Sequence, residues 1–214
     1  MSTFPELQPI HEYAHLLVLD KPAGLLCVPG RGEDKQDCLS ARAQRRWPDA
    51  LVVHRLDMAT SGLVLMARSA AVQRALGDAF AAGEIWKRYE AIVDGLATHT
   101  EWAVIDSPIA ADWPNRPLQK IDPLGKPSLT RWRVLHTHIE RNASHLLLEP
   151  RTGRTHQLRV HLASIGHPIL GDALYGDERV QNLAPRLLLH AGVLQFRHPM
   201  TGVAVRFESP TPFG

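Results

Sequence analysis

Short apolar runs, separated by polar segments that are rich in glycine and proline, recur along the whole chain. Most of these runs are too short for helices and end at turn-forming residues, which is typical of strands. We also expect a turn at residues 60–62, a polar connection at 140–144 and a loop at 150–154. Strands are expected at residues 15–19, 51–53, 63–67, 85–93, 101–105, 118–121, 129–135, 145–148, 187–196 and 203–208.

Two segments in the first half of the chain carry helix signals instead. Residues 38–47 predict a short helix that ends before Pro48. Ser69 is a good N-cap for a helix that runs through Ala82 and ends at Gly83.

A third helix is expected after the loop at 150–154, with Thr155 as its N-cap and Gly166 at its end. Its apolar face consists of Leu158, Leu162 and Ile165. Many strands with few helices, not in strict alternation, indicate an α+β fold. We expect a mixed, mostly antiparallel sheet with flanking helices and loops.

Composition narrows the class of protein. The chain has 214 residues, of which 44% are hydrophobic and 21% charged, and this excludes a disordered or fibrous protein. The size predicts a single domain. Cys27 and Cys38 are too few for a secreted disulfide framework, so we expect reduced thiols. An apolar run of the roughly 20 residues that cross a membrane is missing, as is an export signal, which favours a cytoplasmic protein.

The net charge is only +2, but the charges are unevenly distributed. Between Asp112 and Arg133 the chain has five basic and two acidic residues, and arginines recur from Arg141 to Arg159. A basic middle segment fits a polyanionic partner, and the guanidinium fork of arginine suits phosphates and base edges. A genome composition that favours arginine would explain the same bias.

The strongest local feature is the polar cluster His54-Arg-Leu-Asp-Met-Ala-Thr-Ser-Gly62, which lies between two apolar strands. Asp57 is a candidate nucleophile, general base or metal ligand, although these residues alone favour a turn-capping side chain. Arg55 points to the same face of an extended chain, beside that carboxylate or outward to a phosphate. His54 points the other way and is expected to make a hydrogen bond in the core.

Two further clusters combine aromatic and basic groups. On a strand, Tyr89 of Trp86-Lys-Arg-Tyr89 shares a face with Lys87, and it suits base stacking, proton transfer or plain packing. In Pro150-Arg-Thr-Gly-Arg-Thr-His-Gln-Leu-Arg-Val-His161, a helix N-terminus with arginines suits an anion. The spacing of His156 and His161 does not match a zinc motif, so no metal is expected.

Together these segments resemble the RluA family of pseudouridine synthases. Three motifs in the family's order carry the resemblance: His54-Arg-Leu-Asp57 with Ala59-Thr-Ser-Gly62, Lys87-Arg-Tyr89, and Gly153-Arg-Thr-His-Gln-Leu-Arg159 with His161. The segments His167-Pro-Ile-Leu-Gly-Asp172 and Leu174-Tyr-Gly176 follow as they do in the family. The match extends from Leu16 to Pro210.

Three further segments resemble the family's dual-specificity subgroup: Val28-Pro-Gly-Arg31, Asp112-Trp-Pro-Asn-Arg-Pro117 and Ala184-Pro-Arg-Leu-Leu-Leu-His190. The resemblance implies one pseudouridine synthase catalytic domain over residues 1–214, with its core at about 14–210 and an RNA-binding cleft. An N-terminal module of the S4 type is not expected. The implied substrates are uridines in the anticodon arm of tRNA and in a stem-loop of large-subunit ribosomal RNA.

The resemblance also implies a role for each matched residue. Asp57 is the essential carboxylate, Arg159 is its partner, and Tyr89 stacks on the flipped uracil and takes part in catalysis. Leu158 packs on the other side of the base, and Arg55 fills the gap that the base leaves. Phosphate contacts are assigned to the basic residues Arg116, Lys120 and Arg154. The reaction needs no cofactor and no metal, and a monomer suffices.

Two alternatives stay open. An inactive RNA-binding protein on the same fold has no need of an intact Asp57, Tyr89 and Arg159. A carboxylate-dependent glycosidase needs a second catalytic carboxylate about 5–10 Å from the first, and the sequence offers no clear partner. The residues do not choose between nucleophilic attack by Asp57 and a route through a glycal.

Overall fold

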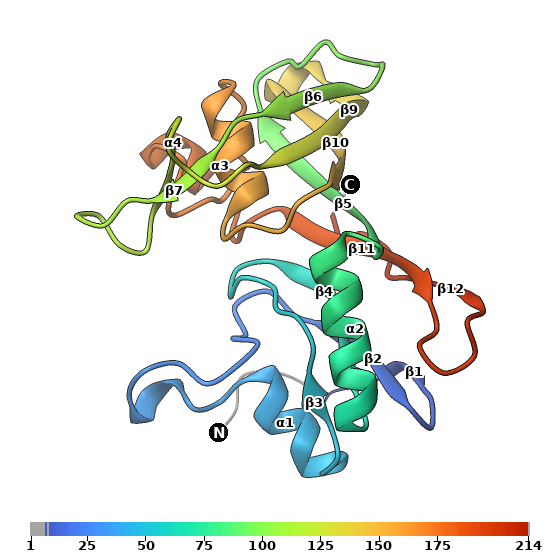
Figure 1. Cartoon of the computed structure of the whole chain (residues 1–214). Coiled ribbons are helices and arrows are strands. Elements are labelled where there is room, and N and C mark those ends of the chain that lie inside the picture. The colour runs from blue at the N-terminus through green and yellow to red at the C-terminus, as the bar shows by residue number, and fades with distance from the viewer. Residues whose placement is uncertain (1–6, 8, 214) are drawn as a thin grey trace. The chain divides into compact units, whose positions relative to one another are not determined.

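The computed structural model describes residue 7 and residues 9–213 (Figure 1). Residues 1–6, where no export signal is expected, lie outside the described residues. The strands are β1 (Pro9–Glu12), β2 (Leu16–Lys21), β3 (Leu51–Val52), β4 (Ser61–Ala67), β5 (Trp86–Asp94), β6 (Ala103–Asp106), β7 (Ile109–Ala111), β8 (Gln119–Ile121), β9 (Leu129–His138), β10 (Ala143–Pro150), β11 (Leu189–Arg197) and β12 (Ala204–Glu208). The helices are α1 (Leu39–Arg46), α2 (Ala70–Ala82), α3 (Gln157–Ser164) and α4 (Glu178–Asn182), with 3₁₀ turns at Glu33–Lys35 and Ile139–Arg141.

The predicted α+β class is confirmed. Every ladder between the named strands whose register is described is antiparallel. Each strand predicted from an apolar run is present in the described part of the chain, with its ends shifted by a few residues. The short elements β1, β7 and α4 were not predicted.

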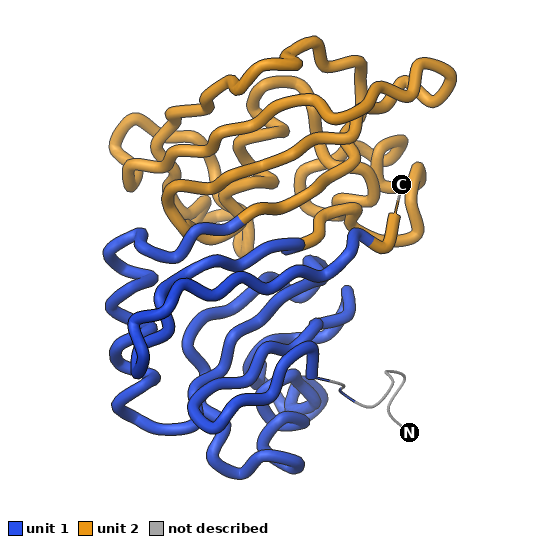
Figure 2. The backbone as a smooth tube through the Cα atoms, turned by 90° about the vertical axis from the view of Figure 1, so that its right-hand side faces the viewer, with its two compact units in different colours: residues 1–87, 191–211 blue, residues 88–190, 212–214 orange. Residues whose placement is uncertain are grey.

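The chain folds into two compact units, which Figure 2 shows in different colours. Unit 1 comprises residues 1–87 and 191–211, and unit 2 comprises residues 88–190 and 212–214. The chain passes between the units within β5, within β11 and again between Thr211 and Pro212. That residues 1–214 act as one catalytic domain stays a prediction.

Unit 1 is built on strands in the order β1-β2-β4-β11, with β3 beside β4 and β12 beside β11. Strand β4 is buried along its whole length. Helix α2 begins at Ser69, whose hydroxyl accepts the amide of Val72, and packs Val72 and Leu76 onto this sheet. Burying each such side chain contributes about 1.5–3 kcal/mol, which anchors the sheet that leads into the His54–Asp57 segment.

Unit 2 contains strands in the order β5-β10-β9-β6 and the separate hairpin β7–β8. Strand β10 pairs with β5 on one side and with β9 on the other. Helix α3 buries Leu158, Val160 and Leu162, and it packs against both β10 and β8. This helix therefore carries the third motif into the interior of unit 2.

The prediction that Thr155 is the N-cap of α3 is wrong. The structure begins the helix at Gln157, after His156 in a left-handed conformation with φ 54°. The Gln157 side chain braces the preceding loop instead, because its Oε1 accepts from the Thr152 hydroxyl and the Arg154 amide. Its Nε2 donates to the Leu129 carbonyl, so the loop is fixed against β9.

The turn expected at residues 60–62 is also displaced. Ser61 and Gly62 already belong to β4. Gly62 has φ +114°, and a Cβ there would collide with the main chain of Ala191 in the same unit. Only glycine permits this close approach, so strand pairing overrides the turn signal of the Thr-Ser-Gly sequence.

Within the described residues, the structure has no helix whose length and apolar character would let it span a membrane.

Candidate active site

The segment that carries Asp57 is irregular and connects β3 to β4. Asp57 is half-buried and Arg55 is exposed, whereas Leu56 between them is 7% exposed. The Leu56 amide donates to Sγ of Cys27 over 3.1 Å, and the Thr60 amide donates to the Asp57 carbonyl over 3.2 Å. The main chain on both sides of the Asp57 side chain is therefore held in place.

A buried lysine braces the same segment. Lys21, at the end of β2, has no exposed surface. Its Nζ donates to the carbonyl oxygens of Pro22, Leu25 and Met58 at 2.8–3.0 Å. Because Met58 follows Asp57 directly, this ammonium ties the Asp57 segment to the turn after β2.

Two groups beside this segment have shifted pKa values. Burial, aided by the charge of Lys87, lowers the pKa of His54 to about 3, so this ring is neutral at pH 7. Its Nε2 accepts the Leu65 amide over 2.9 Å and its ring stacks on Phe80, which confirms the expected core hydrogen bond. Burial also raises the pKa of the Cys27 thiol, which suits an uncharged acceptor for the Leu56 amide.

Tyr89 lies on β5, directly opposite Leu148 of β10, and is half-buried. Lys87, two residues before it, lies 5.8 Å from the Phe80 ring centroid, and burial lowers the pKa of this lysine. Strand geometry places Lys87 and Tyr89 on one face of β5, as the alternation predicts.

Arg159 is the centre of a buried ion pair that the sequence analysis did not predict. Its Nε and Nη2 donate to the two carboxylate oxygens of Asp172 at 2.8 and 2.5 Å. Arg159 is 4% exposed and Asp172 is fully buried. Asp172 also accepts the amides of Leu174 and Tyr175, so this carboxylate is held by four hydrogen bonds.

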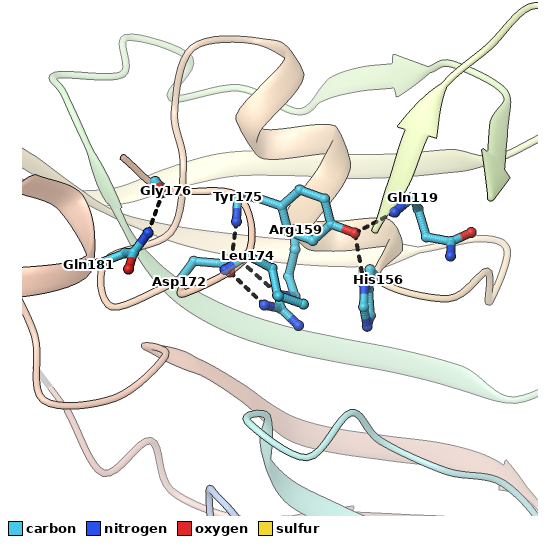
Figure 3. Close-up of polar contacts among 8 residues, drawn as sticks. All are labelled: Gln119, His156, Arg159, Asp172, Leu174, Tyr175, Gly176 and Gln181. Carbon is cyan, nitrogen blue, oxygen red and sulfur yellow. Dashed lines mark hydrogen bonds and ion pairs between the residues drawn. The ribbon is translucent and has the colours of Figure 1, made fainter. Parts of the chain in front are cut away.

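Tyr175 connects this ion pair to the hairpin β7–β8. The Arg159 guanidinium lies 5.2 Å from its ring centroid. The Tyr175 hydroxyl accepts the Gln119 amide over 2.9 Å and lies 2.7 Å from Nδ1 of His156. Figure 3 marks both contacts with dashed lines. One polar network within unit 2 thus joins the hairpin, helix α3 and the loop after Asp172.

The remaining predicted residues also lie in unit 2. Leu158 is 6% exposed on α3. Arg154 is exposed and donates from Nε to the Pro127 carbonyl. Arg116 and Lys120 are exposed on the hairpin, where Nζ of Lys120 lies 3.2 Å from Oδ2 of Asp122. Such a surface ion pair is weak, so the lysine can exchange partners.

The structure thus places Arg55 and Asp57 in unit 1, and the other six predicted residues in unit 2. The pairing of Asp57 with Arg159 stays a prediction, whereas Asp172 is the carboxylate shown on Arg159. Sequence reasoning missed Lys21, Asp172 and Tyr175. An arginine on the buried face of a helix requires a carboxylate, and this rule would have pointed to Asp172.

Cys27 and Cys38 are free, buried thiols, and Cys38 caps α1 by accepting the Ala41 amide. Both ring nitrogens of His161 contact core groups, the Thr130 hydroxyl and the Ser107 carbonyl. Among the described residues, no group of three or more His, Cys, Asp and Glu side chains is arranged to hold a metal ion.

Comparison with known proteins decides the family. The sequence profile of the RNA pseudouridylate synthase family matches residues 15–164, which include the Asp57 segment, Tyr89 and Arg159. The chain belongs to this family. It is an RNA pseudouridine synthase, and RNA is its substrate.

Curated relatives extend the match to nearly the whole chain. The synthase is 44% identical over 210 residues to the dual-specificity RNA pseudouridine synthase RluA of Escherichia coli strain K12, covering 98% of this chain and 95% of that protein. It is 42% identical over 212 residues to the protein of the same name from Pasteurella multocida, covering 99% and 96%.

Solved structures agree with the fold. Human RNA pseudouridylate synthase domain containing 1 matches with a TM-score of 0.82 and 28% identity, over 100% of this chain and 87% of that one. Human RNA pseudouridylate synthase domain containing 4 matches the fold with a TM-score of 0.75 at 23% identity, over 95% and 88%.

Proposed function

We propose that this synthase isomerises specific uridines in two classes of stem-loop, the anticodon arm of tRNA and a hairpin of large-subunit ribosomal RNA. The observation that carries this proposal is the 44% identity, over almost the full length of both chains, to a synthase named for dual specificity. The segments 28–31, 112–117 and 184–190, which resemble the dual-specificity subgroup, support the same substrate choice.

The chemistry requires the uracil to leave and rejoin the same sugar. The bond from C1′ to N1 breaks, the base rotates and a bond from C1′ to C5 forms, after which C5 loses its hydrogen as a proton and N1 takes up a proton. Atoms and electrons balance without an external oxidant or reductant. Because C1′ is shielded in a stacked nucleotide, we infer that the target base is flipped out, at a cost of a few kcal/mol. Loops are suitable targets because their bases are already partly unstacked.

Asp57 is the proposed catalytic carboxylate. An ionised aspartate at the sugar can attack C1′, or it can assist loss of the proton at C2′ through a glycal. The contacts of Lys21, Cys27 and Thr60 to the main chain around Asp57 support this role, because they fix the approach of the carboxylate.

The other motif residues are proposed to handle the base. Tyr89 stacks on the flipped uracil and takes part in proton transfer, and Leu158 packs on its other side. Arg55, which is exposed, fills the gap in the RNA, because its guanidinium can stack and donate hydrogen bonds together. Arg159, whose guanidinium is oriented by Asp172, is the proposed partner of the catalytic carboxylate.

Exposed basic groups are proposed to hold the RNA backbone. Arg116, Lys120 and Arg154 are assigned to phosphates because each is exposed. We further propose that the synthase works as a monomer in the cytoplasm, without metal or cofactor.

Release of tritium from RNA labelled at C5 of uridine tests the substrate proposal directly. The labelled RNAs are an anticodon stem-loop, a ribosomal hairpin and an unrelated RNA. We expect release from the first two only. Release from one hairpin alone would contradict dual specificity, and tight binding without release from any RNA would support the inactive RNA-binding alternative.

A further inference from the structure

Trp113, at the tip of the hairpin β7–β8, is 66% exposed. By contrast, Trp47 and Trp132 are each 4% exposed. A single exposed apolar side chain is ordinary, so exposure alone assigns nothing. The surroundings of Trp113 are what distinguish it.

A cation lies directly over the ring. The Arg116 guanidinium carbon is 3.5 Å from the Trp113 ring centroid, so the two planar groups are in contact. Arg116 is itself exposed. A guanidinium on an indole gives an adjacent pair of surfaces, one that stacks on a base and one that binds a phosphate.

The loop that presents this pair is well ordered by its own hydrogen bonds. The Asp112 amide donates to the Leu118 carbonyl, and the Leu118 amide donates to the Asn115 carbonyl. The Asn115 side chain donates to the Asp112 carboxylate over 2.9 Å. A loop fixed in this way pays little conformational entropy when a ligand binds.

The hairpin is also fixed relative to the site residues of unit 2. The Gln119 amide donates to the Tyr175 hydroxyl, and the Tyr175 amide donates to Asp172, the partner of Arg159 (Figure 3). A nucleotide held on Trp113 is therefore at a defined distance from Arg159.

We propose that Trp113 and Arg116 form a docking site for one unpaired nucleotide of the substrate RNA. Trp113 stacks on the base and Arg116 contacts the phosphate, and the fixed distance to Arg159 helps to select which uridine is isomerised. This inference rests on the proposed stem-loop substrates, because a loop supplies the unpaired nucleotide.

Stem-loops that carry 2-aminopurine at one loop position at a time test the proposal by fluorescence. We expect wild-type protein to quench one position by stacking, and Trp113→Ala to abolish the quenching at that position. Trp113→Ala is expected to weaken RNA binding about 10-fold or more, within the range for one stacked base. Trp113→Phe, which keeps a stacking ring, should retain much of the quenching and much of the RNA affinity.

Trp102→Ala is the matched control. Trp102 is half-buried in the same unit and also has an arginine over its ring, with the Arg131 guanidinium carbon at 4.6 Å. Trp102→Ala should change neither the quenching nor the affinity for RNA. Arg116→Gln should reduce the salt dependence of binding by about one phosphate contact. Thermal melting checks that each variant is folded.

Unchanged quenching at every position in Trp113→Ala, or an equal loss in Trp102→Ala, would overturn the docking site. Wild-type binding no tighter to the stem-loops than to an unrelated RNA would overturn both the site and the proposed substrates. If the wild type binds and quenches but releases no tritium, the proposed substrates fail while the docking site stands.

Discussion

The segment around Asp57 and the cluster around Arg159 are held by different kinds of contact. Around Asp57, the hydrogen bonds at Leu56, Met58 and Thr60 involve main-chain groups. Around Arg159, the central contact joins two side chains, the guanidinium and the Asp172 carboxylate.

This difference predicts which substitutions should reduce catalysis alone and which should also reduce the stability of the fold. Main-chain contacts persist when a side chain is replaced, so the Asp57 position can be changed without loss of the segment that carries it. A buried ion pair does not persist, because removing one partner leaves an uncompensated charge. The stability of the protein should therefore be more sensitive at Asp172 and Arg159 than at Asp57.

The largest expected loss of stability follows Asp172→Ala. This change leaves the Arg159 charge buried and unpaired, which typically costs about 3–5 kcal/mol. Urea denaturation measures it. Asp172→Asn keeps one oxygen that can accept the Leu174 and Tyr175 amides, and it should lose less stability. A loss below about 1 kcal/mol in Asp172→Ala would remove the distinction between the two regions.

Lys21→Met should cause the next largest loss of stability, about 2–3 kcal/mol, because the carbonyls of Leu25 and Met58 lose a charged donor. Turnover should fall as well, since Met58 is attached to Asp57. Denaturation and tritium release measure the two effects. The exposed Lys35→Met is the control, and it should change stability by less than about 0.5 kcal/mol.

The pH dependence of stability tests the lowered pKa of His54. The folded protein keeps this ring neutral down to a pKa of about 3, whereas the unfolded chain takes up the proton near pH 6.5. Stability is therefore lost as the pH falls below about 6.5, by about 2 kcal/mol between pH 7 and pH 5 from this group. His54→Gln should flatten that slope; parallel slopes in the two proteins would refute the shift.

The smallest expected loss of stability among these substitutions follows Tyr175→Phe. Loss of the hydroxyl leaves the Gln119 amide without this acceptor and should cost about 1 kcal/mol. Hydrogen exchange at the Gln119 amide should accelerate. Tyr13→Phe, at an exposed tyrosine of unit 1, is the control, and equal acceleration there would show that the effect is not local.

Local patterns predicted the elements well where one signal dominates. Helix α2 begins after Ser69 and ends at Gly83 as its caps predict, because both signals are local to the helix. The start of α3 was missed because a left-handed His156 and the Gln157 side chain replace an ordinary cap. The residues of the candidate site were likewise predictable only where the signal is local. Its motif residues stand out along the chain, but the Arg159–Asp172 pair joins positions 13 apart through the fold.

Lys21 was missed for a related reason. In the sequence it is one polar residue at the end of an apolar strand, next to a turn. Its function as a brace depends on Met58, which lies 37 residues away along the chain. Periodicity gives the face on which a side chain lies, but it does not give a partner from another element.

The most direct test of the account compares the wild type with Asp57→Asn by tritium release, RNA binding and thermal melting. The account predicts that release falls by at least about 10³-fold, while the affinity for the stem-loop and the melting temperature stay close to those of the wild type. Release within about tenfold of the wild-type rate, from a folded variant that binds RNA, would contradict the assignment of Asp57 as the catalytic carboxylate.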